Sequence, residues 1–252
     1  MDQIYIPKNR VGFDIGNYVT IRILKEGDVE EPTEKLCFYG IKRLEPIKLE
    51  IIRDVFEVID KYADNYENVI ITGSFLERGF KFNDIDIIAI KEENINIERL
   101  RKKIEFAIGI RAHIILISSK TLLLGLSIDP LYSLMLSKCI SKKRIIFKIK
   151  RKFDYKILDF QLLKSKLLID NFDILNGEEK YYLILNMMSI FLFIQDKKLS
   201  KEAVNGSIER EFNVKIEDIK QNMVEKNKFI KKYEIIYNKA FNMIMENLNE
   251  QK

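Results

Sequence analysis

The spacing of hydrophobic residues predicts an alternation of helices and strands over the first 150 residues. Between residues 46 and 64 apolar side chains recur every three or four positions, and Pro46 suits the first turn of a helix. Residues 68–73 and 84–90 are instead short runs rich in β-branched and aliphatic residues, which predicts strands. The same criteria predict a helix that ends at Gly109, a helix from Pro130 to about Cys139, and strands at 112–117 and 144–149.

Beyond residue 154 the strand pattern disappears and only helical spacing remains. Helices are expected around residues 157–167, 178–196 and 199–213, and a last helix places its apolar side chains at Phe229, Tyr233, Ile236, Ala240 and Met243. The predicted fold class is therefore α+β, with a small mixed sheet and flanking helices followed by an all-helical C-terminal domain. The expected domains are residues 1–44, 45–153 and 154–252.

The first 44 residues form a strand-rich extension in this interpretation. Residues 18–24 alternate in polarity and include β-branched side chains, and residues 36–39 are a second short strand candidate. Two roles stay open for this extension: additional strands of the sheet, or a small lid over a site.

Composition excludes several classes of protein. With 252 residues, 47% hydrophobic, the chain is too apolar for intrinsic disorder. Its two cysteines cannot form a disulfide framework, and its single histidine, His113, excludes a multi-histidine zinc site. The longest apolar run, residues 183–194, is too short to cross a bilayer, and the N-terminus lacks the apolar core of a signal peptide. We therefore expect a cytoplasmic protein without a membrane partner, whose net charge of +5 is compatible with anionic ligands.

One segment carries candidate chemistry. A predicted strand ends at Gly73-Ser74, nine residues follow, and Asp84 and Asp86 then lie two positions apart on the next strand. Residues two apart on a strand share a face, so the two carboxylates project together. Such carboxylates suit Mg²⁺ that arrives with substrate phosphates. The Gly73-Ser74 turn offers backbone N–H groups and a hydroxyl to a phosphate.

This arrangement resembles the signature of the polymerase-β-type nucleotidyltransferase superfamily, especially the minimal nucleotidyltransferases, which include antitoxins that transfer AMP. Arg78-Gly79 matches a dipeptide common within that connection, and the resemblance covers about residues 46–150. It implies a nucleotidyltransferase-type fold that binds ATP or another NTP through Gly73, Ser74 and, more weakly, Arg78. It also implies Mg²⁺ or Mn²⁺ on Asp84 and Asp86, and a hydroxyl acceptor that attacks the α-phosphate and releases pyrophosphate.

The third carboxylate that these enzymes supply from a later strand is replaced here. The matching position in residues 111–116 is His113, and an imidazole is a poor ligand for Mg²⁺. His113 is still able to accept a proton from an attacking hydroxyl. Packing of a lone histidine in or beside a strand, a shifted alignment of this strand, and Asp129 as the third carboxylate remain open alternatives.

Two hypotheses for function follow. The first is a Mg-dependent enzyme that moves a nucleoside monophosphate, AMP from ATP, to a hydroxyl of a protein, RNA or small molecule. The second is a catalytically degenerate module of the same fold that senses nucleotides or binds protein or RNA, as an antitoxin would. The basic residues between 142 and 152 are consistent with phosphate contacts, but a charged sheet edge that blocks strand addition is favoured. Homo-oligomer formation stays open.

Overall fold

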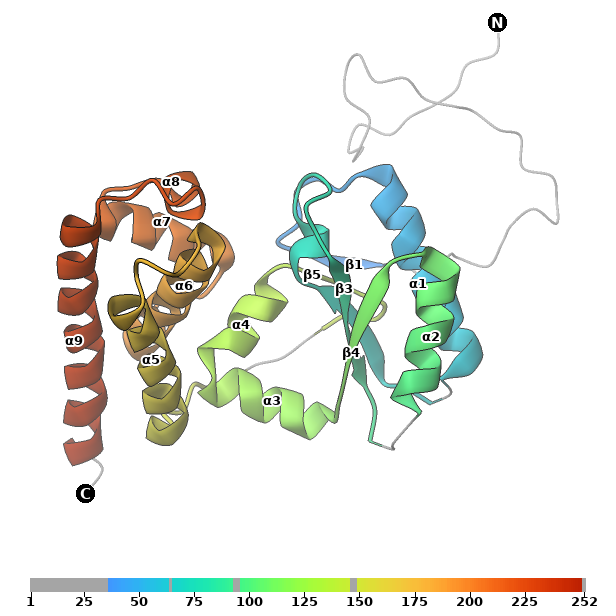
Figure 1. Cartoon of the computed structure of the whole chain (residues 1–252). Helices are drawn as coiled ribbons and strands as arrows, with labels where there is room; N and C mark the ends of the chain where they lie inside the picture. The colour runs from blue at the N-terminus through green and yellow to red at the C-terminus, as the bar shows by residue number, and fades with distance from the viewer. Residues whose placement is uncertain (1–35, 64, 93–95, 146–148, 251–252) are drawn as a thin grey trace, which may run out of the picture. The chain divides into compact units, whose positions relative to one another are not determined.

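The computed structural model describes residues 36–63, 65–92, 96–145 and 149–250, with side chains up to residue 246 (Figure 1). It confirms the α+β class: a five-stranded mixed sheet comes first and a group of helices follows. Residues 18–24, where a strand is predicted, lie outside the described residues.

The sheet has the strand order β1-β5-β2-β3-β4. These strands are Cys37–Tyr39, Cys139–Ser141, Asn68–Thr72, Asp84–Ile90 and Arg111–Ile117 in that order. β2 pairs antiparallel with both β5 and β3, whereas β3 and β4 are parallel. A parallel pair needs a crossover connection, and the helix between β3 and β4 provides it.

Two helices cover one face of the sheet. Helix α1 (Pro46–Tyr62) begins at a proline, and α2 (Ile97–Ile108) is capped by the Asn96 side chain and ends at Gly109, which is left-handed. Their apolar stripes pack against alternate residues of the strands, such as Ile71 and Ile87, in one buried cluster. Figure 1 shows α1 and α2 side by side on this face.

The opposite face of the sheet is covered by α3 (Ser119–Ile128) and α4 (Pro130–Ser137). Leu122 and Leu126 of α3 pack against Ile70, Ile88 and Ile90 of the strands. Helix α3 was not predicted, because its run of leucines lacks a polar face and so gives no helical period.

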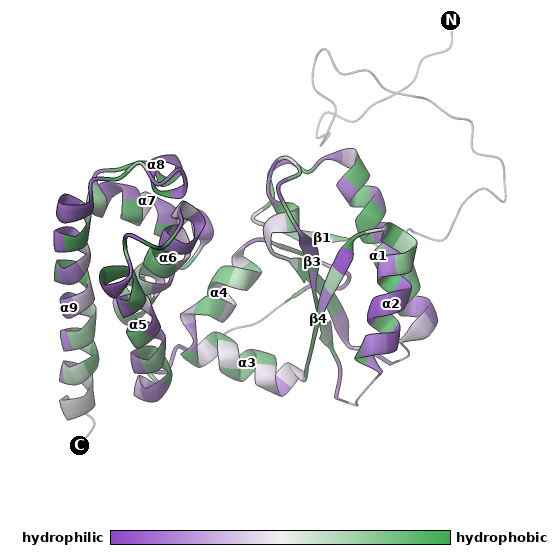
Figure 2. Ribbon diagram, viewed as in Figure 1, coloured by the Kyte–Doolittle hydropathy of each residue, from purple (hydrophilic) through white to green (hydrophobic). Residues whose placement is uncertain are grey.

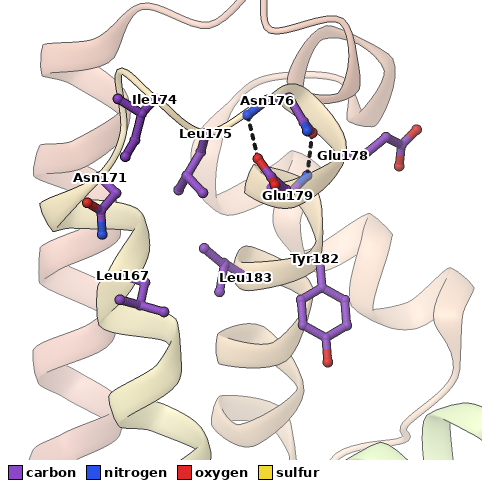
Figure 3. Close-up of a pocket in the computed structure, with 9 residues that line it drawn as sticks. All are labelled: Leu167, Asn171, Ile174, Leu175, Asn176, Glu178, Glu179, Tyr182 and Leu183. Carbon is purple, nitrogen blue, oxygen red and sulfur yellow. Dashed lines mark hydrogen bonds between the residues drawn. The ribbon is translucent and has the colours of Figure 1, made fainter.

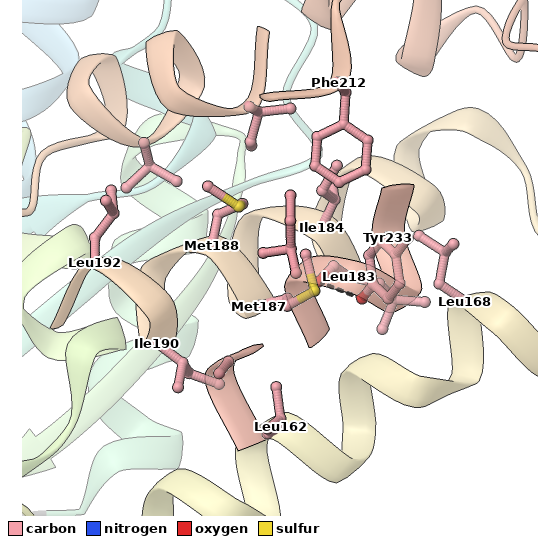
Figure 4. Packing of buried hydrophobic residues seen from close by; sticks show 14 of the residues in the cluster. Leu162, Leu168, Leu183, Ile184, Met187, Met188, Ile190, Leu192, Phe212 and Tyr233 are labelled. Atoms are coloured by element: carbon pink, nitrogen blue, oxygen red, sulfur yellow. Dashed lines mark hydrogen bonds between the residues drawn. The ribbon is translucent and has the colours of Figure 1, made fainter. Parts of the chain in front are cut away.

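The remaining helices are α5 (Tyr155–Asp170), α6 (Gly177–Ile194), α7 (Lys201–Phe212), α8 (Ile216–Lys220) and α9 (Lys226–Glu250). Helix α6 contacts α4, α5, α7, α8 and α9, and it is buried on nearly all sides. Figure 2 shows the contrast with α9, whose hydrophobic and hydrophilic residues alternate along an amphipathic helix. Figure 4 shows Tyr233 in the cluster around α6, with a dashed line from its hydroxyl to Leu183, whose carbonyl oxygen is 3.4 Å away. The same hydroxyl donates to the Ser165 carbonyl oxygen at 2.8 Å.

The strand predicted at residues 144–149 is absent at the positions of that segment that the structure describes. The sheet strand in this region is Cys139–Ser141, which begins at the residue where the predicted helix from Pro130 ends, and residues 144, 145 and 149 have no strand conformation. After β5 ends, side chains rather than a neighbouring strand form hydrogen bonds with the backbone of residues 143 and 145. The Asn68 amide pairs with the backbone N–H and C=O of Lys143 at 2.9 Å, and the Ile145 N–H donates to the Tyr39 hydroxyl at 2.7 Å.

From Leu36 onward the chain forms one compact unit by its backbone contacts. The buried side chains nevertheless form separate clusters, one among α5–α9 and two on the faces of the sheet. The domain boundary between residues 153 and 154 stays a prediction. Among the described residues, no helix is long and apolar enough to cross a membrane.

Candidate functional site

Three side chains lie in a row across neighbouring strands. In the register of the sheet, Asp86 of β3 is opposite Thr72 of β2 on one side and opposite His113 of β4 on the other. Directly paired residues project from the same face of a sheet. This is the face opposite α1 and α2, because the alternate residues Ile85 and Ile87 are buried against those helices.

The Gly73 turn lies directly against the Asp86 carboxylate. Gly73 has φ 87° and ψ −166°, a backbone conformation that is essentially restricted to glycine. A Cβ atom at Gly73 would lie 2.0 Å from Asp86 Oδ2 and 3.2 Å from Asp86 Cβ. Ser74 is exposed at the start of a short 3₁₀ turn (Ser74–Leu76), and the two residues after it are buried. Only glycine therefore brings the backbone this close to the carboxylate.

His113 contacts Asp86. Its Nδ1 atom lies 3.2 Å from Asp86 Oδ1, and the two side chains are 61% and 30% exposed. His113 is thus not a packed core histidine, and it lies beside the carboxylate as the alignment of this strand predicts. Bonding through Nδ1 leaves Nε2 as the nitrogen that is available to a ligand.

Asp129 does not fill the position of the third carboxylate. It is the N-cap of α4, where its Oδ1 atom accepts a hydrogen bond from the Leu131 N–H at 2.9 Å. Burial raises the pKa of this carboxyl group even though the Leu131 N–H lowers it. Asp129 therefore has a structural role in this chain.

The row of residues opens into a cavity of about 500 Å³. Of the residues predicted from the sequence, Gly73, Ser74, Asp86 and His113 line it. Its other lining residues are Thr72, Glu77, Ile115, Leu131, Leu134, Met135, Lys138, Tyr182, Leu185 and Lys201. Asp84 is half-buried on the same face of β3 and does not line the cavity, while Arg78 lines a neighbouring one.

Two lysines that the sequence did not single out contribute to the cavity. Lys138 follows α4, and Lys201 begins α7. Lys201 forms an ion pair with Glu77. Burial raises the pKa of Glu77, but the hydrogen bond and charge of Lys201, together with Lys138 and Lys220, outweigh burial and lower it below its ordinary value. Lys138 and Lys201 thus place two cations in a cavity that is also lined by the carboxylates of Glu77 and Asp86.

A buried lysine fixes the loop between the Gly73 turn and β3. Lys48 of α1 is fully buried, and its ammonium group donates to the carbonyl oxygens of Glu77 and Gly79, the latter at 2.6 Å. Glu45 lies 3.2 Å from the same ammonium group and accepts a hydrogen bond from the Gly79 N–H at 2.7 Å. A buried charge is tolerated only when it is paired and hydrogen-bonded, and these contacts meet that condition.

The donor set at the site fits a metal ion only in part. Asp84 and Asp86 supply two hard carboxylates from one face of β3, which suits Mg²⁺ that is also bound by substrate phosphates and water. No group of three or more His, Cys, Asp or Glu side chains that could hold a metal ion occurs among the described residues. The site therefore fits a metal that arrives with a phosphorylated ligand, and Asp84 and Asp86 are the residues that would hold it.

A separate cavity of about 630 Å³ lies between α5 and α6 (Figure 3). It is lined mainly by apolar residues, among them Leu167, Ile174 and Leu183, and Tyr182 lies at its edge. The capping box at the start of α6, drawn with dashed lines, forms part of its wall. This cavity has no cationic lining residue and does not suit phosphate.

Comparison with known protein families and with curated proteins gave no match for this chain.

Proposed function

We propose that this chain is a nucleotidyltransferase that moves a nucleoside monophosphate, AMP from ATP, to a hydroxyl acceptor in the presence of Mg²⁺. The observation that carries the proposal is the contact between the Gly73 turn and Asp86 inside a cavity that also contains His113, Lys138 and Lys201. Backbone N–H groups, a carboxylate, an imidazole and two cations within one cavity suit a triphosphate and a reacting hydroxyl.

The roles of the residues follow from their chemistry. Lys138 and Lys201 offset the negative charge of the triphosphate, and Ser74 donates to a phosphate oxygen. When bound, Mg²⁺ supplies further neutralisation of the phosphate charge. His113 Nε2 accepts the proton of the attacking hydroxyl, while Asp86 Oδ1 orients the ring through Nδ1. The hydroxyl oxygen bonds to the α-phosphorus as the bond to the leaving pyrophosphate breaks.

The test is transfer of label from α-labelled ATP in the presence of Mg²⁺ and candidate acceptors. Asp84→Asn and Asp86→Asn should each reduce transfer by about 100-fold or more, because each removes a carboxylate that would hold Mg²⁺ beside the phosphates. Asp54→Asn is the matched control, since Asp54 is an exposed residue of α1 that does not line the cavity. Transfer that is unaffected by Asp84→Asn and Asp86→Asn would contradict the assigned site.

A second candidate function is a module of this fold without catalysis that senses nucleotides or binds protein or RNA. It is favoured by His113 at the position of the third carboxylate and by the lack of a three-residue metal-binding group in the described part of the chain. Titration of the protein with Mg-ATP by calorimetry separates the candidates. Binding without transfer to any acceptor would favour the sensing module, whereas the absence of binding would favour a module that only binds protein or RNA.

A further inference from the structure

Helix α5 presents a strip of exposed apolar side chains on the face opposite its buried one. Phe160, Leu163 and Leu167 are 57%, 59% and 50% exposed, and their spacing of three and four residues places them on one face of the helix. The opposite face, which includes Leu158 and Leu162, is fully buried in the cluster that α5 forms with α6 and α9. A contiguous apolar strip that stays exposed in a folded chain is typical of an interaction surface.

The strip leads into the cavity of about 630 Å³ between α5 and α6. Leu167 belongs to both, and Ile174, which is 81% exposed, lines the same cavity beyond the end of the helix (Figure 3). Because the lining is mainly apolar and includes no cation, the cavity suits an apolar side chain supplied by the molecule that covers α5.

Charged residues at the two ends of the strip oppose the helix dipole. Lys156 lies in the first turn of α5 and Asp170 is its last residue, and both are exposed. A cation at the N-terminal end and an anion at the C-terminal end are each unfavourable for a helix. Neither residue forms an ion pair with another residue that the structure describes. Both ends therefore suit a surface that brings the opposite charge to each of them.

This face of α5 is complementary to itself. Its residues follow one another at alternating spacings of four and three, which is the spacing of a helix–helix contact: Lys156, Phe160, Leu163, Leu167 and Asp170. Lys156 and Asp170 are each seven residues from Leu163. A two-fold axis beside Leu163 between two antiparallel copies of α5 thus places Lys156 of each copy against Asp170 of the other. The N-terminus of each helix then also lies beside the C-terminus of the other, which is favourable for both dipoles.

The charges beside the strip follow the same symmetry. Asp159 and Lys166 are exposed, and their spacing of seven residues places them on the same side of the strip. They lie four and three residues from Leu163, so the same two-fold axis brings Asp159 of one copy close to Lys166 of the other. Two sets of opposite charges are therefore matched by one axis.

We propose that this face of α5 binds a second copy of the chain in antiparallel orientation, with Phe160 of each copy in the apolar cavity of the other. The axis beside Leu163 places Phe160 opposite Leu167, and Leu167 lines that cavity. The match of the charges about a single axis identifies the occupant as a second copy, since an unrelated protein would not require this pattern. The inference goes beyond the proposed function and does not depend on it.

Sedimentation equilibrium of the full chain measures self-association across the micromolar range, because an interface centred on one helix is small. The wild type should form a reversible dimer. Leu163→Lys and Phe160→Ala should each weaken dimerisation about tenfold or more, since the first places two charges in the middle of the interface and the second removes two rings from the cavities. Ile47→Lys on α1 and Phe106→Ala on α2 are the matched controls, because they change exposed apolar residues elsewhere and should dimerise like the wild type.

Lys156→Glu and Asp170→Lys test the antiparallel register. Each change alone places like charges against each other at both ends of the dimer and should weaken it about fivefold at low salt. An equimolar mixture of the two variants, one of them fluorescently labelled, should form heterodimers with the affinity of the wild type, because opposite charges then meet at every end. The two positions are about 21 Å apart along one helix, so this restoration cannot arise within a single chain.

Three results would overturn the proposal: a chain that stays monomeric across the micromolar range, a dimer that Leu163→Lys and Phe160→Ala leave unchanged, or a mixture that associates no more tightly than the single variants. Binding of a different protein to α5 of a monomeric chain would equally overturn the second copy as the occupant. Circular dichroism spectra like that of the wild type would show that weaker association does not come from unfolding. The mixture provides an independent check, since an unfolded variant would form no heterodimer.

Discussion

Replacement of Gly73 by alanine tests the contact on which the site depends. The new Cβ would lie 2.0 Å from Asp86 Oδ2, about 1.4 Å short of ordinary van der Waals contact. Rotation of the carboxylate alone does not relieve the clash, because Asp86 Cβ would also be only 3.2 Å away. The Asp86 side chain or the Gly73 turn has to move, and either movement changes the contact between Asp86 and His113.

The expected loss of stability in Gly73→Ala follows from comparison with Gly79→Ala. Gly79 has φ 85°, close to the 87° of Gly73, but a Cβ there would meet no atom within 4 Å. Both substitutions carry a backbone cost of about 1–3 kcal/mol, and only Gly73→Ala adds a steric cost of about 1–3 kcal/mol. For a chain of this size, a difference of about 2 kcal/mol corresponds to a difference of about 4–8 °C in Tm.

Scanning calorimetry and Mg-ATP titration check both parts of this prediction. We expect Gly73→Ala to unfold at a lower temperature than Gly79→Ala and to lose affinity for Mg-ATP. Equal Tm values for the two variants, together with wild-type affinity in Gly73→Ala, would refute the close approach of the Gly73 backbone to Asp86.

Three further predictions concern residues other than Thr72, Asp86 and His113. The Gly79 N–H and the neighbouring groups lower the pKa of Glu45 from 4.5 to about 2, so its carboxylate stabilises the fold above pH 4.5 and this stabilisation is lost as the pH falls toward 2. The Tm difference between wild type and Glu45→Gln, measured by circular dichroism, should therefore be constant above pH 4.5 and vanish near pH 2; a difference that persists there would contradict the assignment. Asn176→Ala removes the capping box of α6 and should reduce the free energy of unfolding in urea by about 1 kcal/mol. Tyr233→Phe removes the buried bond to Ser165 and should cost about 1 kcal/mol in the same assay, whereas unchanged unfolding would show that this bond contributes little.

Local patterns in the sequence predicted most of the elements, because hydrophobic period and end signals are encoded in neighbouring residues. β3 (Asp84–Ile90) and α2 (Ile97–Ile108) lie where the aliphatic run at residues 84–90 and the helical spacing up to Gly109 predict them. The hydrophobic pattern did not predict the elements correctly where tertiary packing or side-chain hydrogen bonds determine the local structure. Helix α3 is rich in leucine throughout, and the described residues 144, 145 and 149 have no strand conformation although a strand is predicted there.

The sequence by itself determined that Asp84 and Asp86 share one face of a strand, because the period of a strand is two. It also placed Gly73 at a turn, since glycine follows a β-branched run there. Only the tertiary structure decided that Thr72, Asp86 and His113 lie in one row, because the register between strands depends on contacts across the whole sheet. It likewise decided that Lys138 and Lys201, which are 63 residues apart in sequence, reach the same cavity. No local pattern encodes where two helix ends meet, since that is set by the packing of α4 and α7 around α6.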